Sequence, residues 1–213
     1  MPVERVCVVG MGPGAEEYLV PLARKKIEEA DILVGSPRLT RLFPGKEARG
    51  LDFSGEPPAT VRFIRDNRER KRIAVLVSGD PGLFSFLGVL ARYLKPEEYE
   101  IVPGISSVQM AFARLKDTWE DAFIHSVHGR RLDGLVEVVK QHRKVALLAD
   151  GRVSPREIAR HLREGGIDDR ELVVCSDLSY SDEKVAPLDP ETSGAQAENS
   201  GNYVMIIRGK RPC

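Results

Sequence analysis

The chain has 213 residues, 42% of them hydrophobic, which is enough for one large domain or two small ones with a buried core. Lysine plus arginine and aspartate plus glutamate both number 32, so the net charge is zero and no bulk attraction to nucleic acid or acidic membranes is expected. The N-terminus has no charged-then-apolar signal segment, and no apolar run approaches the ~20 residues of a membrane span. We therefore expect a cytoplasmic protein with no membrane or nucleic-acid partner.

The cysteines and histidines argue against a metal site. Cys7, Cys175 and Cys213 show no Cys-x-x-Cys spacing. The first two lie in apolar strand-like runs, which is typical of buried, reduced thiols in a cytoplasmic protein. His125 and His128 are close in sequence, but no third metal ligand accompanies them, so we expect no bound metal.

Short apolar runs alternate with segments of helical periodicity along the chain. In chain order, strands are predicted at residues 6–9, 32–34, 73–77, 99–102, 122–125, 145–148, 172–175, 183–188 and 203–207. Helices are predicted at residues 19–30, 38–43, 59–68, 83–91, 108–115, 132–139 and 155–163. This alternation indicates an α/β fold.

Two local signals refine this prediction. The last helix has a strong start, with Ser154 as N-cap, Pro155 at the first helical position and Glu157 three residues after the cap. The polar stretch at residues 116–120 has no periodicity and predicts a boundary. We therefore expect two α/β lobes, the first formed by residues 1–115 and the second by residues 120–213.

Glycine and proline gather directly after three strands of the predicted first lobe. Gly-Met-Gly-Pro-Gly occupies residues 10–14, Ser-Gly-Asp-Pro-Gly residues 78–82, and Pro-Gly-Ile-Ser-Ser residues 103–107. Such turns let a backbone approach a ligand closely, and ligands bind at the carboxyl ends of strands in open α/β sheets. A binding site at this edge is therefore predicted; tight strand-to-helix turns without a ligand are the alternative.

A nucleotide-dependent oxidoreductase is the first rival function, because residues 10–14 hold three glycines after a strand. Their spacing is Gly-x-Gly-x-Gly rather than Gly-x-Gly-x-x-Gly, and Pro13 lacks the N–H that a phosphate loop needs. The second strand ends in Gly35 and Ser36, where an NAD enzyme has an acidic residue for the ribose. These features disfavour NAD binding, and the absence of Gly-Lys-Ser/Thr excludes a Walker loop.

Taken in order, the three motifs, with Leu83 and Phe84 directly after the second, resemble the tetrapyrrole (corrin/porphyrin) methylase family over nearly the whole chain. Within the family, residues 126–130 (Ser-Val-His-Gly-Arg) and 178–184 (Leu-Ser-Tyr-Ser-Asp-Glu-Lys) resemble enzymes that methylate carbon 5 of a corrin precursor. The resemblance implies a homodimer that binds S-adenosylmethionine in a cleft between two α/β lobes. The implied substrate is cobalt-precorrin-7 or precorrin-6Y in cobalamin biosynthesis, with a separate carbon-15 decarboxylating methylase as a possible partner.

The resemblance also implies the residues of the site, motif by motif. Those expected to contact S-adenosylmethionine are Pro13, Gly79, Asp80, Pro81, Leu83, Phe84, Ser106, Ser107 and Ala149. For Asp80 a second role is equally compatible with the sequence, because an aspartate before a proline often forms an Asx turn that holds its own loop.

A corrin precursor carries many carboxylates, which the forked donors of arginine bind well. Arg38 and Arg41 follow the second predicted strand. Arg130 and Arg131 follow the strand after the lobe boundary. We expect all four to contact the substrate; solvated surface arginines are the alternative. His128 in the same loop is a candidate substrate contact and general base, because loss of a proton can follow methylation of a ring carbon.

Two further rivals stay open. Another member of the family would methylate a different ring carbon, diphthine or ribosomal RNA, although zero net charge and the lack of a basic stripe disfavour RNA. A non-enzymatic tetrapyrrole-binding subunit would bind the macrocycle without transferring a methyl group.

Overall fold

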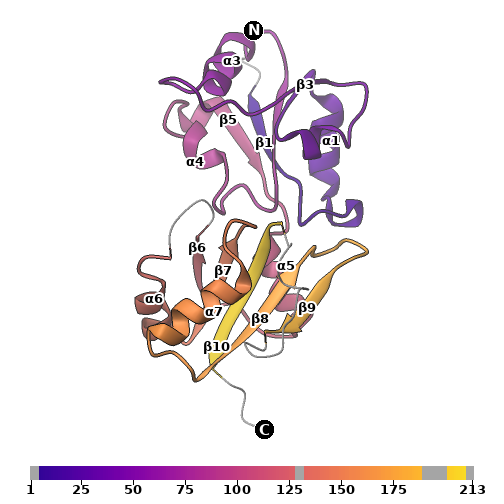
Figure 1. Cartoon of the computed structure of the whole chain (residues 1–213). Coiled ribbons are helices and arrows are strands. Elements are labelled where there is room, and N and C mark those ends of the chain that lie inside the picture. Colours follow the sequence, from indigo (N-terminus) through magenta and orange to yellow (C-terminus); the bar gives the residue numbers. More distant parts are fainter. Residues whose placement is uncertain (1–4, 128–131, 189–200, 210–213) are drawn as a thin grey trace. The chain divides into compact units, whose positions relative to one another are not determined.

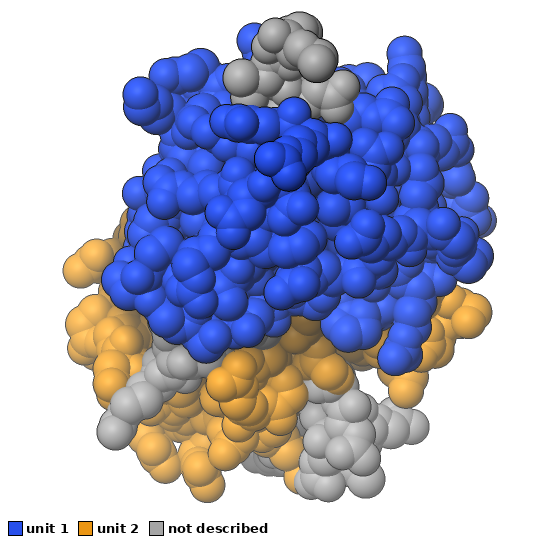
Figure 2. All heavy atoms as spheres, turned by 90° about the horizontal axis from the view of Figure 1, so that it is seen from above, with its two compact units in different colours: residues 1–106 blue, residues 107–213 orange. Residues whose placement is uncertain are grey.

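The computed structural model of the chain describes residues 5–127, 132–188 and 201–209. The chain forms two compact units, residues 1–106 and 107–213, which Figure 2 shows in different colours. Each unit contains a five-stranded sheet with helices packed on it (Figure 1). The α/β class predicted from the sequence is therefore confirmed.

The first unit is built on a parallel sheet with the strand order β3-β2-β4-β1-β5. Its strands are β1 (Val6–Gly10), β2 (Ile32–Val34), β3 (Glu47–Arg49), β4 (Ile73–Val77) and β5 (Tyr99–Val102). Its helices are α1 (Pro21–Glu29), α2 (Pro37–Thr40), α3 (Ala59–Asn67) and α4 (Leu87–Leu90), with short 3-10 turns η1 (Glu16–Tyr18) and η2 (Pro96–Glu98). Every residue of β1 and β4 is buried, as expected for continuous apolar strands covered on both faces.

Alternate side chains of this sheet enter two separate cores, because successive residues of a strand point to opposite faces. On one face, Val75 packs in a core with Ile64 of α3 and Leu90 of α4. On the other face, Leu76 packs in a core with Ile27 of α1. Figure 1 shows α1 on one side of the sheet and α3 and α4 on the other.

The second unit has a mixed sheet with the order β6-β7-β10-β8-β9. Its strands are β6 (Phe123–Ser126), β7 (Lys144–Ala149), β8 (Arg170–Ser176), β9 (Lys184–Pro187) and β10 (Tyr203–Gly209). Its helices are α5 (Ser107–Leu115), α6 (Leu135–Gln141) and α7 (Pro155–Glu164). β6 and β7 are parallel, whereas β10 runs antiparallel to both of its neighbours. Residues of α6 and α7 share the core of one face, where Val139 and Ile158 pack with Met205 of β10.

The chain boundary between the two units falls between Ser106 and Ser107, before α5, whereas the sequence predicts a boundary after this helix. The polar stretch at residues 116–120 is attached to the second sheet. Asp117 accepts hydrogen bonds from Arg208 Nη1 at 2.7 Å and from Lys144 Nζ at 3.2 Å. These ion pairs explain why a stretch without hydrophobic periodicity belongs to a compact unit.

Two elements differ from the sequence prediction. β3 was not predicted, because its three residues are exposed at the edge of the sheet and show no apolar alternation. The helix predicted over residues 83–91 is limited to α4 and begins only at Leu87. The preceding residues form a tight loop in which Phe84 has a left-handed backbone (φ 45°), a conformation that a helix cannot include.

The start of α7 agrees with its sequence signal and gives a stability prediction. Ser154 Oγ accepts the Glu157 N–H at 3.2 Å, and the Glu157 carboxylate accepts the Ser154 N–H at 2.7 Å. Substitution Ser154→Ala removes one half of this capping box and is expected to lower the free energy of unfolding by about 1 kcal/mol. Urea denaturation checks this; an unchanged midpoint would show that the cap contributes nothing.

Candidate active site

The three glycine- and proline-rich loops of the first unit leave neighbouring strands at the same edge of the sheet. β1 lies between β4 and β5, and all three strands are parallel. The loops at residues 10–14, 78–84 and 103–107 therefore start side by side at the carboxyl edge. The convergence that the sequence predicted for this edge is present.

The edge between β1 and β4 is also a topological switch point. From β1 the chain passes across β4 to reach β2, and from β4 it passes across β1 to reach β5. The helices that follow, α1 and α4, consequently pack on opposite faces of the sheet. In open α/β sheets, a crevice for ligands opens at the carboxyl ends of two strands related in this way.

Backbone contacts hold the loops against each other. The Gly12 N–H donates to the Gly79 carbonyl at 3.2 Å, and the Gly79 N–H donates to the Gly12 carbonyl at 2.8 Å. Both glycines have left-handed backbones, with φ of 72° and 69°. Gly104 approaches so closely that an added β-carbon would lie 2.4 Å from the Gly79 carbonyl oxygen. Glycine is thus required here because the loops pack closely against each other. From the sequence, these glycines were expected to let the backbone approach a ligand.

Asp80 connects two of these loops through both oxygens of its carboxylate. Oδ1 accepts the Gly82 N–H at 2.8 Å within its own loop. Oδ2 accepts the Gly104 N–H at 3.1 Å from the loop after β5. Of the two roles that the sequence left open, the structure therefore provides the loop-holding one directly.

The loop after β4 ends in an exposed aromatic ring. The Leu83 N–H donates to the Asp80 carbonyl at 3.1 Å, and Ser85 Oγ donates to the Pro81 carbonyl at 2.5 Å. Between these two turns Phe84 has its left-handed backbone, and the residue is 54% exposed. A large apolar ring held outside the core at a ligand edge is available for contact with a bound molecule.

Arg38, which is predicted to contact the substrate, lies close to a loop that is predicted to contact the cofactor. It lies in α2, directly after β2, and its Nη2 donates to Ser78 Oγ at 3.2 Å. Arg41, one turn later at the end of α2, is exposed. The guanidinium of Arg38 therefore lies beside the loop after β4, at the carboxyl edge of the sheet.

The geometry of the first loop also separates this fold from a dinucleotide-binding one. β1 ends at Gly10, but α1 begins only at Pro21, after the short turn η1. No helix N-terminus follows the glycines at the distance that a pyrophosphate needs. Pro13 lies in this loop and is partly buried. The rival oxidoreductase function therefore loses its structural basis.

The remaining residues that are predicted to contact the cofactor are divided between the two units. Ser106 is buried at the end of the first unit, and Ser107 is the first residue of α5. Ala149 is buried at the end of β7, opposite Tyr203 in the register of β10. His128, Arg130 and Arg131 lie outside the described residues.

The carboxyl end of β7 gathers polar groups that the sequence did not single out. Asp150 is buried and accepts the Arg152 N–H at 3.0 Å and Arg152 Nε at 3.1 Å. The Tyr203 hydroxyl donates to the Val153 carbonyl at 2.7 Å, and burial raises the pKa of this phenol. The Val127 N–H donates to the Leu148 carbonyl at 2.9 Å, so Val127, directly after β6, lies beside the end of β7.

A carboxylate in the second unit was also missed. Glu183 pairs with Arg114 of α5, at 2.5 Å between Oε1 and Nε, and accepts the Ser179 N–H at 2.7 Å. The Arg114 guanidinium is the main cause that lowers the pKa of Glu183. The family motif at residues 178–184 includes Glu183, but its partner lies 69 positions away in the sequence and carries no signal there.

The two cysteines that the structure describes lie in unreactive surroundings. Cys7 and Cys175 are free and buried, and burial raises the pKa of each thiol to about 12. In the parts of the chain that the structure describes, no group of three His, Cys, Asp or Glu side chains is arranged to hold a metal ion. No helix among these residues has both the length and the apolar character needed to cross a bilayer.

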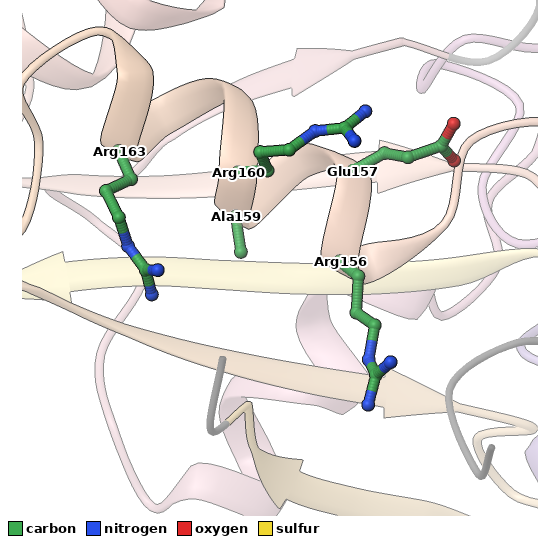
Figure 3. A pocket seen from close by; sticks show the side chains of 5 residues that line it. All are labelled: Arg156, Glu157, Ala159, Arg160 and Arg163. Atoms are coloured by element: carbon green, nitrogen blue, oxygen red, sulfur yellow. The ribbon is translucent and has the colours of Figure 1, made fainter. Parts of the chain in front are cut away.

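A hollow of about 270 Å³ lies beside α7, and Figure 3 shows the side chains around it. It is lined by Arg156, Glu157, Ala159, Arg160 and Arg163. None of these belongs to the motifs that predicted the site, and they all come from one helix.

A parallel sheet with glycine- and proline-rich loops at its switch point is the arrangement at which α/β proteins bind small molecules. The family model described as Tetrapyrrole (Corrin/Porphyrin) Methylases matches residues 5–190. The chain is 35% identical to a probable cobalt-precorrin-7 C(5)-methyltransferase of Methanocaldococcus jannaschii, over 85% of this chain and 87% of that protein. This chain belongs to the tetrapyrrole methylase family and is therefore a methyltransferase.

Other relatives and solved structures agree. The cobalt-precorrin-7 C(5)-methyltransferase of Salmonella typhimurium is 34% identical over 94% of this chain and 97% of its own length. The precorrin-6Y C(5,15)-methyltransferase (decarboxylating) of a Sinorhizobium species is 31% identical over 84% of this chain, but only 43% of that protein is covered.

Two crystal structures have the same fold. A precorrin-6Y methylase from Archaeoglobus fulgidus superposes with a TM-score of 0.73 at 24% identity, covering 98% of this chain and all of that one. A uroporphyrin-III C-methyl transferase from Thermus thermophilus, complexed with S-adenyl homocysteine, gives a TM-score of 0.74 at 23% identity, over 96% of this chain and 97% of its own. The α/β tetrapyrrole methylase fold that the family resemblance implies is confirmed.

Proposed function

We propose that this chain transfers a methyl group from S-adenosylmethionine to carbon 5 of a corrin precursor, with cobalt-precorrin-7 or precorrin-6Y as the substrate and cobalamin as the end product of the pathway. The observation that carries this proposal is the match to a C(5)-methyltransferase over almost the full length of both chains. The converging loops support it independently, because they form a ligand edge of the kind that such a reaction needs.

The residues at this edge suit S-adenosylmethionine in kind. The ligand has an amino acid part, a ribose and an adenine, which need both donors and acceptors. Loops rich in glycine and proline offer backbone N–H and carbonyl groups, and Ser106 adds a buried hydroxyl. Leu83 and Phe84 offer apolar surface beside them. The Asp80 carboxylate already accepts two backbone N–H groups, so we propose that it acts mainly by holding the loops.

When bound, S-adenosylmethionine supplies an activated methyl group with its own leaving group. The chain must then align the methyl group with the ring carbon and exclude water. Alignment alone can lower the activation free energy by up to ~7–11 kcal/mol. The loops are hydrogen-bonded to one another through Gly12 and Gly79, so they need little reorganisation when a ligand binds. For the proton that leaves the ring carbon, we keep His128 as the proposed base. The proposed contributions of the second unit are Ser107, Ala149, His128, Arg130 and Arg131.

On the substrate side, we propose that Arg38 binds a carboxylate of the macrocycle, together with Arg41, Arg130 and Arg131. Arg38 Nη2 donates to the neutral hydroxyl of Ser78, and the residue is exposed, so a substrate carboxylate can reach its guanidinium. A carboxylate would form the stronger, charge-assisted pair.

Substitution Arg38→Gln is expected to raise KM for the corrin precursor about 10- to 100-fold, since a charge-assisted hydrogen bond is worth about 1.5–3 kcal/mol. The affinity for S-adenosylhomocysteine should stay within about twofold of the original. Steady-state kinetics and calorimetry measure the two quantities, with the exposed Arg92→Gln as the matched control. An unchanged KM would remove Arg38 from the substrate site.

We further propose that the enzyme works in the cytoplasm as a homodimer. The two free, buried thiols support a reducing compartment. We also propose that a decarboxylating methylation at carbon 15 is carried out by a separate methylase. The relative that this chain matches over almost its full length is named for the C(5) reaction alone. The relative named for the C(5,15) reaction is matched over less than half of its length.

The experiment that tests the reaction is incubation with methyl-labelled S-adenosylmethionine and a panel of acceptors, read by mass spectrometry and NMR. The panel holds cobalt-precorrin-7, its cobalt-free counterpart, uroporphyrinogen III and a diphthine precursor protein. We expect one label, at carbon 5, on the cobalt or cobalt-free corrin precursor. Label at another ring carbon or on the protein would overturn the assignment, and binding of the macrocycle without transfer would favour a non-enzymatic subunit.

A further inference from the structure

The connection between β8 and β9, residues 177–183, has a backbone that needs external support. Asp177 and Ser179 both have left-handed backbones, with φ of 50° and 75°, although neither is glycine. Such conformations persist only where surrounding contacts fix them, and they concentrate at functional sites. The turn between them is closed by the Tyr180 N–H, which donates to the Asp177 carbonyl at 3.0 Å.

Glu183 supplies that support from the end of the same loop. Its Oε2 accepts the Ser179 N–H at 2.7 Å. Arg114 clamps the carboxylate with two donors, Nε to Oε1 at 2.5 Å and Nη2 to Oε2 at 3.1 Å. The two side chains are only 35% and 21% exposed, so water competes weakly for this pair. The loop is therefore fixed through one carboxylate to α5.

One element that this ion pair joins carries a proposed cofactor contact, and the other leaves the second sheet at the edge where a further one lies. Arg114 belongs to α5, which begins at Ser107. The loop follows Ser176, which lies opposite Tyr203 in β10, and Tyr203 in turn lies opposite Ala149 at the end of β7. The loop therefore leaves the second sheet at the edge where Ala149 lies. Tyr180 lies within this loop and is 39% exposed.

We propose that Tyr180 is a further contact for the corrin precursor and that Glu183 is the residue that positions it. An exposed tyrosine gives a macrocycle an apolar face for packing and gives its carboxylates a hydroxyl donor. Glu183 acts through the backbone: it holds the Ser179 N–H and so fixes the direction in which Tyr180 leaves the loop. This inference rests on the proposed methyl transfer to a corrin precursor.

A double-mutant cycle tests the proposal in the full-length enzyme. Tyr180→Ala is expected to raise KM for the corrin precursor about tenfold and to leave the affinity for S-adenosylhomocysteine within twofold. Glu183→Ala should produce a similar rise, and the double variant should be no worse than either single one, because both changes remove the same contact. The conservative Glu183→Gln, which keeps an acceptor for the Ser179 N–H, should recover most of the loss. Asp182→Asn, an exposed neighbour, is the control and should behave like the wild type.

Hydrogen exchange gives a readout that does not depend on activity. The Ser179 amide should be protected in the wild type and in Tyr180→Ala, and should exchange at least tenfold faster in Glu183→Ala. Additive losses in the cycle, or an unchanged KM in Tyr180→Ala, would overturn the proposal. A rise of KM in Glu183→Ala that is not reversed in Glu183→Gln would also overturn it. A wild-type enzyme that methylates no corrin precursor would instead refute the proposed function, and the exchange experiment would still report whether Glu183 holds the loop.

Discussion

Substitution Gly104→Ala is expected to disrupt the meeting of the three loops and to abolish most cofactor binding. The added β-carbon would lie 2.4 Å from the Gly79 carbonyl oxygen and 2.8 Å from the Gly10 carbonyl carbon. Both are backbone atoms, one at the end of the buried strand β1 and one in the loop after β4, so neither can move away as a flexible side chain can. Overpacking of this kind costs about 1–3 kcal/mol and sometimes more. We expect a loss of about 3 kcal/mol in the free energy of unfolding and at least a tenfold weaker affinity for S-adenosylhomocysteine.

Urea denaturation and calorimetry with S-adenosylhomocysteine measure the two effects of Gly104→Ala. The matched control is Gly88→Ala in α4, where an added β-carbon meets no atom within 4 Å. Alanine favours a helix over glycine by about 0.5–1 kcal/mol, so this control should be as stable as the wild type or slightly more so. A Gly104→Ala protein that binds and unfolds like the wild type would show that the loops are not packed as described.

The second large effect is expected at Asp80. Substitution Asp80→Ala removes the acceptor for the Gly82 and Gly104 N–H groups and so releases the loop after β4 from the loop after β5. Hydrogen bonds to a charged acceptor contribute about 1.5–3 kcal/mol each, less where water can replace them. We expect S-adenosylhomocysteine affinity to fall about 10- to 100-fold. Asp80→Asn keeps one acceptor oxygen, so its affinity for S-adenosylhomocysteine should fall about tenfold or less.

Asp52→Asn is the control for this series, because Asp52 also accepts a backbone N–H two residues on, from Ser54 at 2.8 Å, but does not join the three loops. Its affinity for S-adenosylhomocysteine should be that of the wild type. If Asp80→Asn and Asp80→Ala bind the ligand as tightly as this control, the carboxylate does not organise the site.

The parts of the fold that the sequence predicted are those governed by local rules. β4 is a continuous apolar run that could only be buried on both faces, and the capping box of Ser154 and Glu157 begins α7 where its residue spacing requires. The common edge of the three loops followed from parallel strands alone, because their carboxyl ends must lie together.

The parts that the sequence could not predict depend on contacts between distant residues. The pairing of Arg114 with Glu183 joins a helix to a loop far along the chain, and no local pattern announces it. The left-handed Phe84 interrupts a helical pattern of apolar residues, since Asp80 and Ser85 form the competing turns with the loop's own backbone. The antiparallel position of β10 between β7 and β8 is a matter of topology, which apolar runs do not encode.

The most direct test of cofactor binding by the three loops is a crystal structure of the protein with S-adenosylhomocysteine. We expect the ligand at the carboxyl edge of β4, β1 and β5, in contact with the loops at residues 10–14, 78–84 and 103–107. Ligand density elsewhere, for example in the arginine-lined hollow on α7, with these loops free of it, would contradict the assignment of the site.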